Sequence, residues 1–167
     1  LGTFYGYKME GIFQSQEEID NHAYQLTTRV APGDFKFKDI NQDGKIDSKD
    51  QTYIGNAFPN FNYGFILNLA YKGFDLSVFS QGVNGNKIYN ALRQSILNDF
   101  TVNSNVSPEM MNYWGRVLDD GTTVTNTNIP RLGSLQNNNA RFSDYYLEDG
   151  SYFRSEEHTS ELQSRHN

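Results

Sequence analysis

The sequence predicts an all-β fold, an antiparallel transmembrane β-barrel fragment with long extracellular loops that carry short helices. Three observations predict it. Aromatic residues make up 14% of the 167 residues although the mean hydropathy is −0.69, which suits strands with rings on one face and polar groups on the other. Apolar and polar residues also alternate over long stretches. No run of apolar residues is long enough to form a membrane-spanning helix.

The longest alternating stretch begins at Phe61. Every second residue up to Tyr71 is aromatic or aliphatic, and the residues between them are small or polar apart from Ile66. Lys72-Gly73 predicts a two-residue hairpin turn, and the return strand alternates again with one exception, Phe79. Strands of about nine to eleven residues can cross a bilayer at a tilt, whereas soluble strands average about five or six. The alternative is a half-buried hairpin in a soluble sandwich.

Residues Asp39 to Asp50, with the sequence DINQDGKIDSKD, have the spacing of a calcium-binding loop. Calcium takes about six to eight oxygen ligands, and a twelve-residue loop supplies them from alternate positions around one tight turn. The turn falls on Gly44. The predicted ligands are the side chains of Asp39, Asn41, Asp43, Asp47 and Asp50, with the carbonyl of Lys45. A solvated turn rich in Asp and Asn is the alternative.

Short helices are predicted in the long segments. Ser15 to Glu18 form a capping box that opens a helix toward Tyr24, and Ser48 to Gln51 are predicted to cap one helical turn. A longer helix is predicted for Lys87 to Phe100. Another begins at Ser107-Pro108-Glu109 and runs through Trp114, with proline at its first position. Because a strand, Phe35 to Lys38, precedes the calcium loop, we expect a structural calcium site and not a paired sensor.

Four residues in these segments are candidates for substrate binding: Tyr89, Asn90, Tyr113 and Trp114. Aromatic rings of this kind stack on sugars or pack against a lid, but they also form the small cores of loops. Both alternatives stay open at this point.

Composition excludes several functions. The chain has no cysteine, so it forms no disulfide and has no thiol nucleophile. Its net charge of −6 disfavours nucleic acid as a partner. His22 is expected on the exposed side of a short helix, and no acid–base couple or nucleophile stands out. The sequence therefore does not predict an enzyme.

Three blocks of the sequence carry a resemblance to a known family: GTFYGYKMEGIFQSQEEID, the stretch from APGDFKFKD to NGNKIYN, and RFSDYYLEDGSYFR. In this order they resemble the C-terminal region of SusC/RagA-type TonB-linked outer-membrane transporters, over residues 2–154. The resemblance implies a plugged barrel in the outer membrane of a Gram-negative cell that imports oligosaccharides or peptides. It also implies TonB and a SusD-type surface lipoprotein as partners.

We interpret the chain as a fragment that does not include the leader, the plug and the TonB-contacting segment of such proteins. We therefore expect residues 1–154 to be part of a barrel that cannot close alone. Because periplasmic turns are short in such barrels, Lys72-Gly73 is expected in the periplasm and the calcium loop outside the cell. The alternative function is a secreted, calcium-stabilised carbohydrate-binding or adhesion module.

Residues 155–167, SEEHTSELQSRHN, are expected to be non-native. They have no two-residue alternation, and RSEEHTSELQS matches a translated sequencing adapter. An ordinary polar tail or a short helix is the alternative. In either case His158 and His166 are not expected to bind a ligand.

Overall fold

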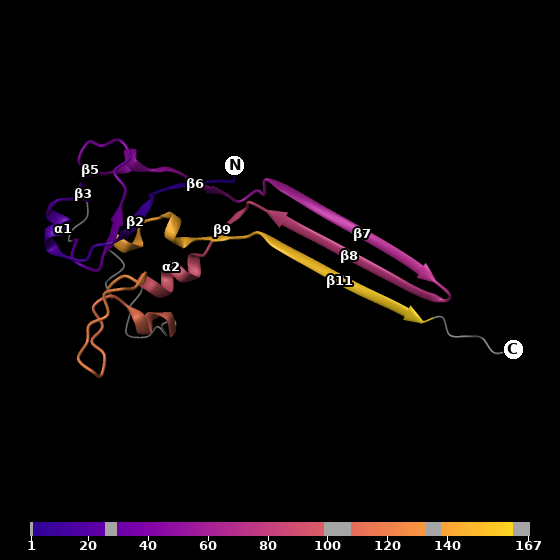
Figure 1. Ribbon diagram of the computed structural model, residues 1–167. Coiled ribbons are helices and arrows are strands. Elements are labelled where there is room, and N and C mark those ends of the chain that lie inside the picture. Colours follow the sequence, from indigo (N-terminus) through magenta and orange to yellow (C-terminus); the bar gives the residue numbers. More distant parts are fainter. Residues whose placement is uncertain (1, 26–29, 99–107, 133–137, 162–167) are drawn as a thin grey trace. The chain divides into compact units, whose positions relative to one another are not determined.

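The computed structural model describes residues 2–25, 30–98, 108–132 and 138–161 (Figure 1). The chain divides into two compact units, which we call the strand unit and the core unit. The strand unit comprises residues 1–2, 56–88 and 149–167, and the core unit comprises residues 3–55 and 89–148.

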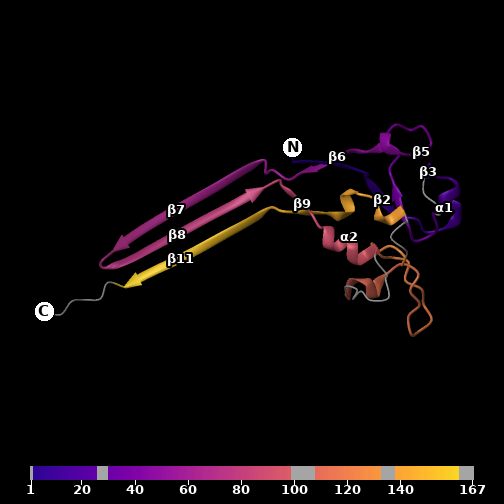
Figure 2. The same ribbon diagram turned by 180° about the vertical axis from the view of Figure 1, so that it is seen from behind.

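Three long strands form the strand unit: β7 (Phe61–Tyr71), β8 (Phe74–Asn84) and β11 (Tyr152–Glu161). They make one antiparallel sheet in the order β11–β8–β7, and both views show them side by side (Figures 1 and 2). The turn between β7 and β8 has Lys72 at φ +48° and Gly73 at φ +88°, the left-handed conformation that two-residue hairpins use. The predicted strands and turn are confirmed.

The register separates the two faces of the hairpin. Because Leu67 pairs with Val78 and Leu69 with Leu76, the apolar positions of both strands share one face. Ile66 and Phe79, the two exceptions to the alternation, pair directly with each other on the other face. That second face is therefore mixed and not uniformly polar.

Strand β11 extends further than the sequence predicts. The alternation holds as far as Phe153, which pairs with Gly82 on the apolar face, and then Glu157 lies opposite Val78 on that same face. The pairing continues to Glu161, so a short helix after Arg154 is wrong. Backbone pairing does not depend on side chains, and the non-native origin of residues 155–167 stays a prediction. The His158 side chain and His166 lie outside the described part of the chain.

Four pairs of short strands complete the described sheets. Strand β2 (Met9–Ile12) pairs antiparallel with β4 (Phe35–Phe37), and β3 (Tyr24–Gln25) pairs parallel with β5 (Lys45–Ile46). Strand β1 (Thr3–Gly6) pairs with β6 (Thr52–Asn56). The remaining pair is β9 (Lys87–Tyr89) with β10 (Leu147–Asp149).

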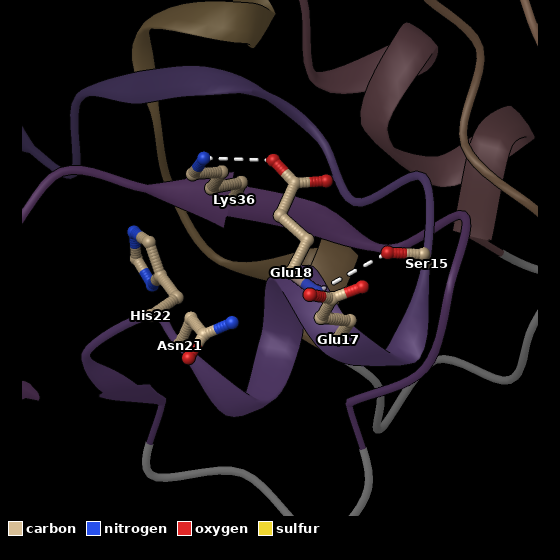
Figure 3. Close-up of a pocket in the computed structure, with 6 residues that line it drawn as sticks. All are labelled: Ser15, Glu17, Glu18, Asn21, His22 and Lys36. Carbon is tan, nitrogen blue, oxygen red and sulfur yellow. Dashed lines mark hydrogen bonds and ion pairs between the residues drawn. The ribbon is translucent and has the colours of Figure 1, made fainter.

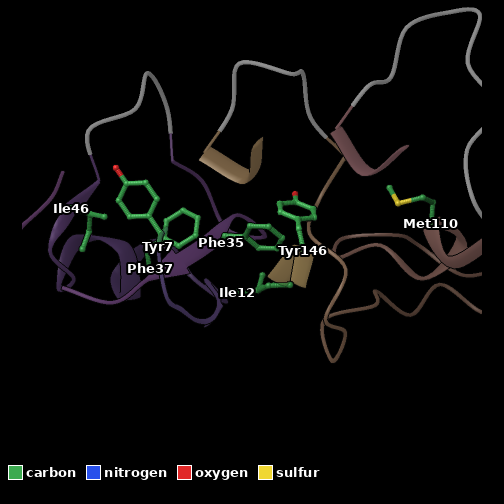
Figure 4. Close-up of a cluster of buried hydrophobic side chains, with 7 residues drawn as sticks. All are labelled: Tyr7, Ile12, Phe35, Phe37, Ile46, Met110 and Tyr146. Carbon is green, nitrogen blue, oxygen red and sulfur yellow. The ribbon is translucent and has the colours of Figure 1, made fainter. Parts of the chain in front are cut away.

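The core draws on segments far apart in the sequence. Strand β4 confirms the predicted alternation, since Phe35 and Phe37 are fully buried and Lys36 between them is half-buried. The buried cluster contains Tyr7, Ile12, Phe35, Phe37, Ile46, Met110 and Tyr146 (Figure 4). These side chains come from both ends of the core unit, so its two chain segments fold as one body.

The helices are shorter than predicted. Helix α1 (Gln16–Asp20) has the expected cap, with the Glu18 N–H donating to Ser15 Oγ at 3.2 Å, but it ends before Tyr24 because Tyr24 pairs in β3. Helix α2 (Ala91–Asn98) starts after β9, so Lys87–Tyr89 is strand and not helix.

Four short 3-10 helices complete the described elements: η1 (Ser48–Asp50), η2 (Pro108–Asn112), η3 (Asn138–Ala140) and η4 (Asp144–Tyr146). Element η2 ends before Trp114, where a longer helix was predicted, and Ser107 lies outside the described residues. Among the described residues, no helix has the length and apolar character to span a membrane. The described strands form sheets of two or three strands and no closed barrel.

Candidate functional site

The predicted calcium loop folds around its own carboxylates. The Asp39 carboxylate accepts the backbone N–H groups of Gln42 at 2.7 Å and Gly44 at 2.9 Å. Gln42 and Gly44 have φ values of +60° and +80°, and a Cβ on Gly44 would meet no atom within 4 Å. The tight turn therefore lies at the predicted position. Gly44 is needed for its left-handed backbone conformation and not for lack of space, because residues with a side chain rarely adopt that conformation.

Asp50 closes the loop from a fully buried position. Its carboxylate accepts backbone N–H groups from Asp47 at 2.8 Å, Ile40 at 3.0 Å and Asn41 at 3.4 Å. Burial by itself raises the pKa of the Asp50 carboxyl, but these N–H groups stabilise the charged form and hold the pKa below its ordinary value. Asp47 in turn accepts the Lys49 N–H at 2.7 Å. The cap of η1 is therefore Asp47, one residue before the predicted Ser48.

The remaining predicted ligands also bond within the loop. Asp43 accepts the Lys45 N–H and the Asn41 side-chain amide, both at 3.0 Å. The donor chemistry suits calcium because every predicted ligand atom is an oxygen. In the arrangement described, however, the carboxylates accept backbone N–H groups. Within the described ranges, no three histidine or carboxylate groups are placed to hold a metal ion. Calcium binding stays a prediction.

Two of the four predicted substrate residues form hydrogen bonds with the first turn of helix α2. The Asn90 side chain caps it, since Oδ1 accepts the Arg93 N–H at 2.7 Å while Nδ2 donates to Glu148 at 2.7 Å. The Tyr89 hydroxyl donates to Gln94 Oε1. Burial raises the pKa of the Tyr89 hydroxyl. Both side chains therefore have structural partners, and their contact with substrate stays a prediction.

The other two residues follow η2. The Trp114 indole N–H donates to Gln14 Oε1 at 3.0 Å, and its ring covers Gly33 so closely that a Cβ there would lie 2.5 Å from Cε3. Trp114 and Tyr89 both pack against the buried cluster, as the loop-core alternative expects. Tyr113 is half-buried, and its backbone N–H donates to Met110. In the described part of the chain, no side-chain hydrogen bond involves Tyr113, whereas each of the other three side chains makes at least one.

A buried ion pair was not predicted from the sequence. The Arg131 guanidinium donates from Nε to Asp34 Oδ1 at 2.8 Å and from Nη2 to Oδ2 at 3.0 Å, and Asp34 is fully buried. Asn139 Nδ2 and the Ala31 N–H also donate to the Asp34 carboxylate, at 3.1 and 2.9 Å. Arg131 is 97 residues from Asp34, so no local pattern could have paired them.

Side-chain amides complete the hydrogen bonding of strand β4. Gln25 Nε2 donates to the Phe35 carbonyl at 3.0 Å, and Gln25 Oε1 accepts the Phe37 N–H at 2.8 Å. Asn139 Oδ1 accepts the Phe35 N–H at 2.8 Å. Buried backbone groups need such partners. These amides therefore replace the neighbouring strand that β4 lacks on this side.

A shallow pocket of about 370 Å³ lies beside α1 (Figure 3). Lys36 Nζ lies 2.8 Å from Glu18 Oε1 on its wall. The Gln14 N–H and Lys36 both stabilise the charged carboxylate and lower the pKa of Glu18. His22 was expected to be exposed, but only 13% of its side chain is, because its ring packs edge-on against Phe13 at 5.3 Å. The pocket is lined by Ser15, Glu17, Glu18, Asn21, His22 and Lys36.

Comparison with known proteins finds two receptors to which the chain is similar. No family model matches it. TonB-dependent receptor P3 of Formosa agariphila is 32% identical over 154 residues, which is 92% of this chain and 14% of the receptor. TonB-dependent receptor P26 of the same organism is 34% identical over 156 residues, 91% of this chain and again 14% of the receptor. Over nearly its whole length, therefore, the chain is similar to one part of two TonB-dependent receptors, and it spans 14% of the length of each.

Proposed function

We propose that the chain forms part of an outer-membrane TonB-dependent transporter of a Gram-negative cell, with β7 and β8 of the three-stranded sheet as transmembrane strands. The observation that carries the proposal is the apolar face of this sheet. Its middle is aliphatic, with Leu67, Leu69, Leu76 and Val78, and it is exposed or only partly covered. Water disfavours such a surface, and lipid does not.

Aromatic rings border this aliphatic band at both ends. Tyr71 and Phe74 pair beside the turn. At the other end Tyr63 stacks on Phe153 with ring centroids 6.4 Å apart, and Phe61 lies 5.9 Å from Tyr63. Aromatic girdles flank the apolar band of outer-membrane barrels in this way.

The strand length fits a bilayer. Strand β7 has 11 residues, which rise about 35 Å and span roughly 25 Å at a tilt of about 45°. Because β7 and β8 are joined by two residues, we place Lys72-Gly73 in the periplasm, and the long segments before β7 and after β8 outside the cell.

Four arginine substitutions test the membrane assignment in the full-length protein. Leu67→Arg and Leu69→Arg place a charge on the apolar face, which costs about 2 to 4 kcal/mol at the bilayer midplane. Asn68→Arg and Ala70→Arg lie on the opposite face, where we propose a wet lumen. The measurement is the amount of folded protein in the outer membrane. Equal losses for both pairs would contradict the assignment of faces.

We also propose the partners and the substrate. The two related receptors support TonB as the energy-coupling partner, acting through a part of the protein outside this chain. The resemblance to SusC/RagA-type transporters supports a SusD-type surface lipoprotein and an oligosaccharide or peptide as substrate. Tyr113 gives the sharpest test of the substrate contact, because no side-chain hydrogen bond to another described residue would be lost with it. Tyr113→Ala should weaken substrate binding without changing stability, whereas Asn90→Ala should destabilise the helix that it caps by about 1 kcal/mol.

We propose calcium as the ligand of the Asp39–Asp50 loop. Calcium would have to share or replace the backbone N–H groups that Asp43 and Asp47 now accept. Its effect would be to fix the connection between β4 and β6. Titration calorimetry with calcium tests this, with Asp39→Ala/Asp43→Ala as the variant. If the wild type takes up no calcium at millimolar concentration and chelator leaves proteolysis of the loop unchanged, the loop is only a turn.

A further inference from the structure

The turn between β7 and β8 carries an unexpected residue. Lys72 has φ +48° and Gly73 has φ +88°, so both central positions are left-handed. Asparagine, aspartate and glycine are the usual residues at the first of these positions, because a side chain such as lysine is disfavoured there. Lysine is therefore not the residue that makes this turn most stable, and another role must favour it.

Charge is confined to this end of the hairpin. Between Phe61 and Asn84 the only charged residues are Lys72 and Asp75. Asp75 pairs with Ala70 and so lies on the opposite face from the paired rings of Tyr71 and Phe74. None of the ion pairs between described residues involves Lys72. Its ammonium group lies 5.2 Å from the centroid of the Tyr71 ring.

The two rings expose a large apolar surface around this cation. Tyr71 is 70% and Phe74 65% exposed. Rings of this kind settle at the headgroup level of a bilayer, and a lysine beside them reaches the level of the phosphates. Among the described side chains this cation has no carboxylate partner, which makes it complementary to an anionic headgroup.

We infer that the Tyr71–Phe74 turn is a binding site for the phosphate of an anionic phospholipid. Lys72 pairs with the phosphate, and the rings of Tyr71 and Phe74 enter the lipid below it. This inference rests on the proposed function, which places β7 and β8 in the membrane, and it adds a specific lipid contact to it. The bound lipid belongs to the leaflet of the membrane at which the β7–β8 turn lies.

The test compares wild type with Lys72→Asn and Lys72→Arg. The full chain, folded in detergent, is added to vesicles of phosphatidylcholine alone or with phosphatidylglycerol, and bound protein is measured by flotation. The chain has a net charge of −6, so the informative quantity is the ratio of variant to wild type on each vesicle. Lys72→Asn should reduce binding about fivefold on anionic vesicles, with no change on neutral ones. Lys72→Arg should bind like wild type.

Lys72→Asn should also stabilise the turn, because asparagine favours the left-handed conformation at this position. A loss of lipid binding then has no explanation in misfolding. The difference between wild type and Lys72→Asn should also shrink at high salt. Equal binding of both proteins to anionic vesicles overturns the lipid site. Failure of wild type to bind either vesicle overturns the proposed membrane strands themselves.

Discussion

Phe35 and Phe37 of the core unit and Phe61 and Phe65 of the strand unit belong to the same kind of alternating pattern. Their surroundings differ completely, since Phe35 and Phe37 are 0% exposed while Phe61 and Phe65 are 55% and 58% exposed. In the core unit, segments about one hundred residues away cover the rings. In the strand unit, no described segment covers them. Alternation thus specifies which face of a strand is apolar and leaves open what covers that face.

A matched pair of phenylalanine truncations gives the largest expected effect. Phe35→Ala removes a fully buried ring that packs against Tyr145 at 4.6 Å, and should destabilise the core unit by about 3 to 5 kcal/mol. Phe65→Ala removes an exposed ring and should leave the core unit unchanged. Urea unfolding followed by the fluorescence of Trp114, the only tryptophan, measures this. Equal midpoints for the two variants would contradict the division into units.

The same contrast separates the features that could be predicted from the sequence from those that could not. The hairpin was predictable in full, because its pairing is local and the turn residues Lys72-Gly73 fix the register. The short strand at Phe35 was predictable from its alternation alone, although its partner β2 is not adjacent in the sequence. The helix predicted from Lys87 to Phe100 was wrong at its start, where Lys87–Tyr89 pairs with β10 instead. Distant pairing overrides local helix propensity.

The candidate sites divide in the same way. The turn at Gly44 was predictable from the spacing of the loop, but the burial of Asp50 was not, because it depends on how the loop closes on itself. The link between Asp34 and Arg131 had no local signal at all. Trp114 was singled out as a substrate-binding residue, which stays a prediction, and the partner found for its indole N–H is Gln14, 100 residues away.

The second prediction compares ion pairs of the two units. Asp34→Ala leaves the Arg131 guanidinium and the Ala31 N–H without their acceptor, and should destabilise the core unit by about 3 kcal/mol. Arg154 and Glu156 of the strand unit form an exposed pair at 2.5 Å, and Arg154→Ala should change stability by less than about 1 kcal/mol. Urea midpoints give both values. A loss for Arg154→Ala as large as that for Asp34→Ala would show that burial is not the cause.

Two glycines of the strand unit give a smaller effect. A Cβ on Gly82 would lie 2.3 Å from Tyr63 Cζ and 2.8 Å from the Tyr152 carbonyl oxygen, whereas a Cβ on Gly64 would meet its nearest atom at 3.8 Å. Gly82→Ala should therefore displace Tyr63 from its stack on Phe153 and cost about 1 to 2 kcal/mol. Gly64→Ala should be neutral or slightly stabilising. Thermal unfolding in detergent distinguishes them, and identical shifts would argue against the ring packing over Gly82.

The smallest expected effect concerns one carboxylate from each unit. In the strand unit the Asp149 carboxylate accepts hydrogen bonds from the Ser151 side chain and from the Ser151 N–H, the latter at 2.8 Å. Together with the nearby charge of Lys87, these bonds lower the pKa of Asp149 to about 2. In the core unit, backbone N–H groups outweigh burial and lower the pKa of Asp50. Both pKa values lie below the ordinary 3.8. Each charged carboxylate therefore stabilises the fold above pH 3.8, and its contribution is lost as the pH falls through its folded pKa.

NMR titration of the two side chains should show midpoints below 3.8, with that of Asp149 near 2. Salt should raise the Asp149 midpoint slightly, because it screens Lys87. It should leave the Asp50 midpoint unchanged, because the partners of Asp50 are backbone N–H groups that carry no net charge. Protonation of Asp50 removes the acceptor of three N–H groups and should loosen the loop. A normal midpoint for Asp50 would mean that the loop does not close around it.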